Sequence, residues 1–219
     1  GLTVGVFNGG GFVNLYAAVL LTSSLAILFF GLLEIRERGI SGFHHISKFA
    51  LVAVASFVLI NAYWLLPQMH AMRNFYGALV EDFGGTDGLV AWTGTISHNA
   101  SLLNLLRLQG LSDWYRPGHP YSGPFLTNGV LVLVGFLLPL MAFIPLLWKQ
   151  LHIPRRHVLF FSLLAIVSVA FMGGTHPPLG FVYQLLMEQI PGFAVFRSPI
   201  LKFTPALELS YAILIAVTV

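Results

Sequence analysis

The stretch that decides the fold is FVNLYAAVLLTSSLAILFFGLL, residues 12–33, an apolar run without a charged side chain. Because a helix rises about 1.5 Å per residue, a run of this length crosses the roughly 30 Å hydrocarbon core of a bilayer. Charged residues make up 9% of the chain, against about 25% in a typical soluble domain, and the mean hydropathy is +0.83. The sequence therefore predicts an all-α, polytopic helical membrane protein.

Further apolar runs complete the predicted set of about five transmembrane helices. They cover residues 46–66, 126–148, 158–172 and 205–219. The last of these runs is shorter than the roughly 20 residues that a span needs. Since the chain begins without Met and ends inside this run, we expect residues 1–219 to be a single membrane domain, a fragment of a longer polypeptide whose last helix is truncated.

The basic residues of the loops predict the orientation in the membrane. Three Lys or Arg side chains fall within residues 34–48, three within 149–157, and only three within the much longer segment 67–125. The positive-inside rule then places 34–45 and 149–157 in the cytoplasm. Residues 67–125 and 173–204 fall on the extracytoplasmic side, in agreement with strict alternation of the spans.

The two external segments are expected to carry short interfacial or re-entrant helices. One is predicted over residues 99–108 and the other over 181–190. Residues 193–203 are expected to run extended, and the next helix to begin at Thr204, with Pro205 in its first position. Because irregular backbone at membrane depth needs protein or water to cover it, we expect an external groove roofed by these segments.

The composition also excludes several kinds of chemistry. There is no cysteine, so disulfides and thiol catalysis are excluded. The eight histidines form no HxH or HxxxH pair, so neither a metal site nor another cofactor is expected. The net charge is only +3 and the cations sit in loops, which indicates membrane topology and not a nucleic-acid partner.

Two cations in the second external segment are the leading candidates for ligand binding. Arg197 and Lys202 lie in apolar, proline-containing sequence, where a membrane span does not require them. Arginine is suited to bidentate contacts with phosphate, and lysine adds a point charge. The pair is therefore predicted to bind the phosphate of a lipid. The alternative is that both side chains anchor the span among the headgroups.

Four other residues complete the candidate substrate site. His176 offers a hydrogen bond to a donor or acceptor substrate, or else holds the Gly/Pro-rich turn that contains it. Asp113, Trp114 and Arg116 form a patch typical of sugar binding, in which the ring stacks on a sugar face and the carboxylate accepts hydroxyl hydrogen bonds. A headgroup-level anchor accounts for the same patch equally well.

The remaining acidic candidates have two readings each. Glu81, Asp82 and Asp87 offer a general base or a metal ligand, but a solvated Gly-rich turn is the favoured explanation. Glu208 is an ionisable group near a span, which favours function. A place in the first turn of its helix would explain it equally well, since carboxylates are stabilised there.

Parts of the second external segment resemble a known family of membrane proteins. GTHPPLG at residues 174–180, IPGF at 190–193 and FRSP at 196–199, followed by Lys202, are similar to the late portion of large GT-C-type proteins. The likeness is to bacterial YfhO-type proteins and to mycobacterial arabinofuranosyltransferases. NAYWLLP at 61–67 is similar to a span end in such proteins, and the rest of the chain resembles them in layout only.

The resemblance implies a glycosyltransferase of a prokaryotic plasma membrane that moves a sugar from a polyprenyl-phosphate donor to an extracytoplasmic acceptor. Arg197 and Lys202 would then stabilise the leaving lipid phosphate. The catalytic acid of such enzymes lies in the first external loop, which we expect in the remainder of the polypeptide. Two alternatives stay open: a transporter or flippase for an anionic lipid or sugar, and a non-catalytic membrane scaffold subunit.

Overall fold

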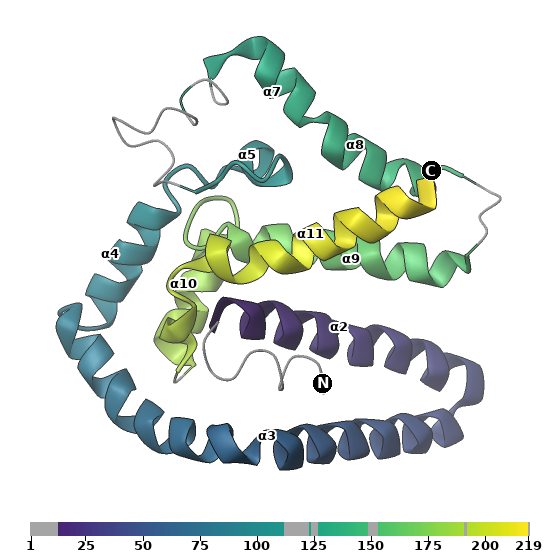
Figure 1. The fold of residues 1–219 in the computed structure, drawn as a ribbon, viewed down its shortest axis with the longest axis horizontal. Coiled ribbons are helices and arrows are strands. Elements are labelled where there is room, and N and C mark those ends of the chain that lie inside the picture. Colours follow the sequence, from purple (N-terminus) through teal and green to yellow (C-terminus); the bar gives the residue numbers. More distant parts are fainter. Residues whose placement is uncertain (1–12, 112–122, 124–126, 149–152, 191, 219) are drawn as a thin grey trace. The chain divides into compact units, whose positions relative to one another are not determined.

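The computed structural model describes residues 13–111, 123, 127–148, 153–190 and 192–218. Over these ranges the ordered elements are helices, and no strand occurs (Figure 1). Five of the described helical segments are long and apolar enough to cross a membrane. The predicted class, an all-α polytopic membrane protein, is confirmed.

The chain divides by its internal contacts into two compact units, residues 1–79 and 80–219. The first unit contains α2 (Val13–Arg38) and most of α3 (Ile40–Asp82). Only Gly39 separates them: its φ of +60° suits glycine, and its N–H donates to the Ile35 carbonyl at 2.8 Å. The expected loop over residues 34–45 is therefore helical on both sides of this single residue.

Helix α3 is far longer than a membrane span. Its 43 residues correspond to roughly 65 Å at about 1.5 Å per residue, and its candidate span ends at Tyr63. The first part of the expected external segment is thus a continuation of the helix. Pro67 lies inside it, so the proline that appeared to close the second span does not end the helix.

The second unit begins at the end of α3, which two glycines close. Gly84 and Gly85 have φ values of +71° and +101°, and their N–H groups donate to the carbonyls of Glu81 and Val80. Helix α4 (Thr86–Ile96) follows directly. The sequence analysis did not predict α4, because its Gly-rich beginning is typical of a turn.

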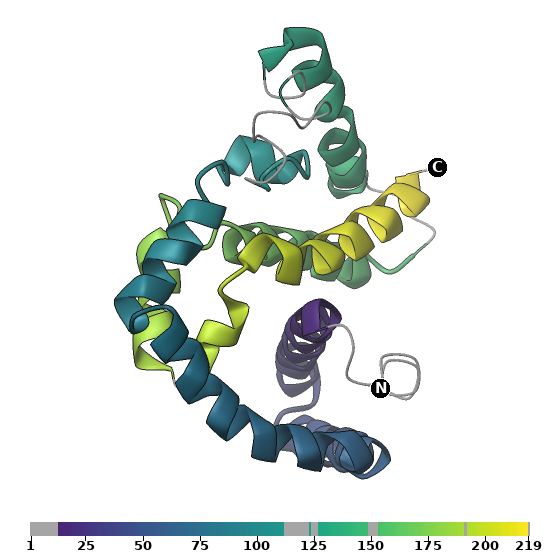
Figure 2. The same cartoon turned by 60° about the vertical axis from the view of Figure 1, so that its left-hand side comes forward.

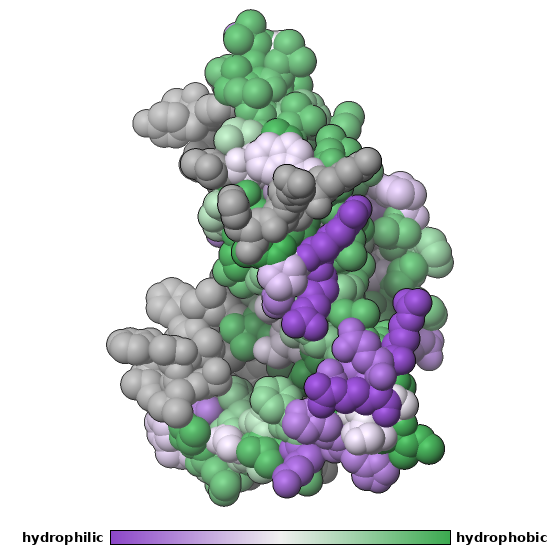
Figure 3. Space-filling model, turned by 90° about the vertical axis from the view of Figure 1, so that its right-hand side faces the viewer, coloured by the Kyte–Doolittle hydropathy of each residue, from purple (hydrophilic) through white to green (hydrophobic). Residues whose placement is uncertain are grey.

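Two shorter elements follow α4 on the way to the third span. Helix α5 (Leu102–Leu106) lies within the predicted range 99–108, and the Ser101 hydroxyl caps it by accepting from the Asn104 N–H at 3.4 Å. The third span, Gly129–Leu146, consists of α7 (Gly129–Gly135), α8 (Leu137–Phe143) and the 3-10 turn η2 (Ile144–Leu146). The surface of α7 is almost entirely hydrophobic (Figure 3), as contact with lipid requires.

Helices α9 (Arg155–Met172) and α11 (Pro199–Thr218) form the core of the second unit. They lie side by side along their length in both ribbon views (Figures 1 and 2), and α8 packs on α11 as well. Leu164 of α9 and Leu207 and Leu214 of α11 are completely buried. Between the two helices the chain forms α10 (Gly180–Gln189), which packs against α4, and the 3-10 turn η3 (Phe193–Phe196).

The expectation of an extended segment over residues 193–203 is wrong. Residues 193–196 form η3, and α11 begins at Pro199, whose fixed φ suits the first position of a helix. Thr204 does not cap the helix, since its hydroxyl donates to the Ile200 carbonyl at 2.6 Å inside α11. Pro205 lies within α11, and the helix begins six residues before it, at Pro199.

Candidate functional site

Arg197 and Lys202 lie where η3 passes into α11. Arg197 directly follows η3 and is half-buried, whereas Lys202 lies in the first turn of α11 with only 8% of its surface exposed. Among the described residues, the one ion pair joins Arg38 to Glu34, in the first unit. The described part of the chain therefore offers neither cation a carboxylate, and their two like charges repel one another.

The backbone beside Arg197 is held by side chains of two other helices. Tyr183 of α10 donates its hydroxyl to the Phe196 carbonyl at 2.7 Å, and Thr93 of α4 donates to the Arg197 carbonyl at 3.1 Å. Thr93 is fully buried and Tyr183 is 3% exposed. Two consecutive carbonyls are thus fixed from α4 and α10, which sets the position from which the Arg197 side chain extends.

Burial has an electrostatic consequence for Tyr183. Loss of hydration raises the pKa of its phenol well above the ordinary value, because the ionised form is poorly solvated there. The side chain therefore remains a neutral donor to Phe196. Its ring also packs at 5.2 Å from that of Phe193, which in turn lies 5.2 Å from Phe196.

The guanidinium of Arg197 lies over an aromatic ring at the end of α3. Its Cζ is 5.6 Å from the ring centroid of Phe83, within the range of a cation–π interaction. Phe83 in turn meets Trp92 of α4, with 5.6 Å between centroids and 64° between the ring planes. Gly88 permits this arrangement, since a Cβ there would collide with the Phe83 carbonyl oxygen.

The turn after α9 fits tightly between α4 and the start of α11. Gly174 has a φ of +53°, and a Cβ there would collide with Ser97 Oγ and lie 2.6 Å from Pro199 Cγ. The half-buried His176 follows in this turn, and its N–H donates to the Gly173 carbonyl at 2.9 Å. The backbone of His176 thus supports the turn, and within the described ranges its ring forms no hydrogen bond.

The structure describes three of the six candidate ligand-binding residues. His176 and Arg197 lie in the connection between α9 and α11, and Lys202 lies in the first turn of α11. Asp113, Trp114 and Arg116 lie outside the described residues. The sugar-binding patch predicted from them therefore stays a prediction.

The acidic candidates also have defined positions. Glu81 and Asp82 end α3, Asp87 lies in the first turn of α4, and all three are exposed. Across the described ranges, His, Asp and Glu side chains form no group of three that could hold a metal ion. Glu208 lies near the middle of α11 and is exposed, so the first-turn explanation for this carboxylate is wrong.

Sequence reasoning missed the residues that frame Arg197. Phe83, Trp92, Thr93 and Tyr183 belong to no motif, and they meet the Arg197 segment only through the packing of α4 and α10. One local signal was present: an aromatic residue followed by two glycines at a helix end. The tertiary contacts that give these residues their role have no signature in a single sequence.

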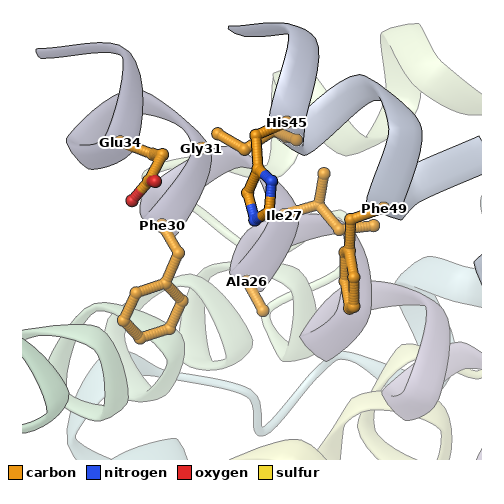
Figure 4. Close-up of a pocket in the computed structure, with 8 residues that line it drawn as sticks. Ala26, Ile27, Phe30, Gly31, Glu34, His45 and Phe49 are labelled. Carbon is orange, nitrogen blue, oxygen red and sulfur yellow. The ribbon is translucent and has the colours of Figure 1, made fainter. Parts of the chain in front are cut away.

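A groove in the first unit is a separate feature. It lies between α2 and α3, has a volume of about 320 Å³ and is mainly apolar. Figure 4 shows Glu34 and His45 at one end of the groove and Phe30 and Phe49 at the other. Glu34 also pairs with Arg38 at 3.0 Å, so the polar end of the groove carries a neutralised acid.

Comparison with protein-family profiles, with curated protein sequences and with solved structures gives no match for this chain. Its class follows from its own features: five long apolar helices define an integral membrane protein. The candidate ligand-binding cations lie at the junction of η3 and α11.

Proposed function

We propose that this chain is the lipid-phosphate-binding part of an integral-membrane glycosyltransferase. The donor is a sugar carried on a polyprenyl phosphate, and the acceptor is extracytoplasmic. Arg197 and Lys202 hold the phosphate, and the base that deprotonates the acceptor lies elsewhere in the polypeptide. The resemblance of the second external segment to GT-C-type proteins suggests this function, and the geometry around Arg197 and Lys202 is compatible with it.

The observation that carries the proposal is a pair of neighbouring cations without a described acid partner. A largely buried ammonium is costly unless an anion or a set of acceptors compensates it. Lys202 is 8% exposed and Arg197 adds a second positive charge beside it. The phosphodiester of the donor would carry one negative charge and the departing polyprenyl phosphate up to about two, so the pair would compensate the charge that develops as the sugar leaves.

The position of the pair relative to the membrane favours a lipid over a soluble anion. Lys202 lies in the first turns of a candidate span, and Arg197 directly precedes that span. A polyprenyl chain enters the bilayer while its phosphate remains at the interface, where these cations begin α11. The exposed cations Arg155 and Arg156 lie at the start of α9, the other candidate span of this core.

Sugar transfer tests the proposal. Vesicles containing the full-length protein are supplied with undecaprenyl phosphates that carry radiolabelled glucose or arabinose and with a cell-envelope extract as the source of acceptor hydroxyls, and release of the sugar from the lipid is followed. We expect Arg197→Ala and Lys202→Gln to reduce release at least tenfold, because each removes charge stabilisation from the leaving phosphate. The control is Arg155→Ala, which removes an exposed cation of the same unit and should leave the rate unchanged.

Two results would contradict the proposal. Undiminished release in both variants at equal protein levels would mean that the cations take no part in the reaction. Movement of intact donor across the vesicle membrane, without release of sugar, would identify a transporter of the same lipid instead.

A further inference from the structure

An exposed tryptophan is linked to Arg197 through the ring of Phe83. Trp92 is 41% exposed, although it lies beside the face of α4 on which Leu89 and Thr93 are completely buried. Its neighbour Phe83 lies under the guanidinium of Arg197. Two steps of 5.6 Å, from Arg197 Cζ to the Phe83 ring and from there to the Trp92 ring, put the indole within about 11 Å of the cation.

We propose that Trp92 is the platform for the sugar ring of a glycosylated lipid phosphate whose phosphate is held by Arg197 and Lys202. This inference rests on the proposed function. A glycosyl phosphate joins an anion directly to a ring with apolar C–H faces. An exposed indole that is separated from a guanidinium by one aromatic ring matches this combination, because its π-face attracts polarised C–H groups.

The segment that joins α3 to α4 also carries polar groups that a sugar can use. Asp82 and Asp87 are exposed on either side of the Gly84–Gly85 turn that carries Phe83 toward α4. Carboxylates accept hydrogen bonds from sugar hydroxyls, and an aromatic ring with a few polar groups around it is the usual composition of a small-ligand site. The sequence favours a solvated turn for Asp82 and Asp87. In the present proposal these carboxylates accept hydrogen bonds from the sugar.

The arrangement is also fixed in place. Thr93, the residue next to Trp92, donates to the Arg197 carbonyl at 3.1 Å, so α4 and the cation-bearing segment are held in register. Phe83 provides a second link, because its ring contacts both Trp92 and the Arg197 guanidinium. The distance from platform to cation is therefore set by contacts within one compact unit.

Binding of two lipids that differ only in the sugar tests the inference. The full-length protein in nanodiscs is titrated with undecaprenyl phosphate and with undecaprenyl-phosphate glucose or arabinose. We expect Trp92→Ala to weaken binding of at least one sugar-bearing lipid about tenfold and to change the affinity for the bare lipid phosphate less than twofold. Trp92→Phe, which retains an aromatic face, should restore most of the lost affinity.

The matched control is Trp148→Ala, which removes another exposed indole, 44% accessible and at the end of a different span. It should affect neither lipid. Equal loss for both lipids in Trp92→Ala would identify Trp92 as a bilayer or phosphate contact and overturn the inference, as would no loss at all. If the proposed function itself is wrong, Arg197→Ala will leave the affinity for both lipids unchanged. This result distinguishes failure of the phosphate site from failure of the Trp92 platform.

Discussion

At the scale of single residues, the central feature is a lysine that the fold buries without a described acid partner. Lys202 keeps 8% of its surface exposed and has the positive Arg197 as a neighbour. The carbonyls of Phe196 and Arg197 accept hydrogen bonds from two buried side chains, Tyr183 and Thr93. The packing thus holds Arg197 and Lys202 near each other. Two like charges in this position cost free energy unless an anion binds.

Tyr183→Phe tests the support of this segment. The Phe196 carbonyl loses its donor, and we expect the free energy of unfolding in detergent to fall by about 1 kcal/mol at neutral pH. Binding of undecaprenyl phosphate should weaken as the Arg197 backbone loosens. The exposed Tyr63→Phe serves as the control and should change neither quantity. Unaltered stability and binding in Tyr183→Phe would remove this bond from the account.

The same tyrosine predicts an alkaline loss of stability. Burial raises the pKa of Tyr183 in the fold, whereas the unfolded chain ionises near the ordinary value of about 10. Its contribution to stability is therefore constant below roughly pH 10 and falls as the pH rises further, by up to about 1.4 kcal/mol per pH unit. Denaturant unfolding between pH 8 and 11 should show a shallower alkaline decline for Tyr183→Phe than for the wild type.

At the scale of elements, the contact between α4 and the η3–α11 junction organises the site. Thr93 is the link: its hydroxyl has a single hydrogen, which is shared between the Leu89 carbonyl of α4 at 2.8 Å and the Arg197 carbonyl at 3.1 Å. The sequence predicted an all-α chain with five long apolar helices, because long apolar runs are local signals. It did not predict α4 or the start of α11, because glycine and proline have several local meanings and packing chooses among them.

Thr93→Val and Thr95→Val form a matched pair for this contact. Both hydroxyls donate to the carbonyl four residues earlier, but only Thr93 also reaches another element. We expect Thr93→Val to lower the free energy of unfolding by about 1–3 kcal/mol, since a half-buried carbonyl loses its partner, and to weaken lipid-phosphate binding. Thr95→Val should be close to neutral. Equal effects of the two changes would mean that the loss comes from α4 itself.

At the scale of the whole molecule, the main question is which elements share a side of the membrane. Composition alone predicted an integral membrane protein, and five long helices confirm it. The side on which each loop lies follows from the positive-inside rule and stays a prediction. Glu208, exposed near the middle of α11, adds a constraint, because a carboxylate at such depth requires water or a polar partner from the rest of the protein.

Cysteine labelling tests the predicted sidedness, since the chain contains no cysteine of its own. Thr95→Cys and Gln189→Cys introduce thiols at exposed positions of α4 and α10, and Arg156→Cys introduces one at the start of α9. A membrane-impermeant maleimide added to intact cells should label positions 95 and 189 but not 156. Labelling of 156, or of only one of the other two, would contradict the predicted topology.

The most direct test of the central claim is the affinity for a lipid phosphate. Undecaprenyl phosphate is titrated into nanodiscs that contain the full-length wild type, Arg197→Ala or Arg155→Ala. A charge-assisted hydrogen bond is worth about 1.5–3 kcal/mol, so we predict a roughly 10- to 100-fold weaker Kd for Arg197→Ala and an unchanged Kd for Arg155→Ala. The same Kd in all three proteins, with folding intact, would contradict a phosphate site at Arg197 and Lys202.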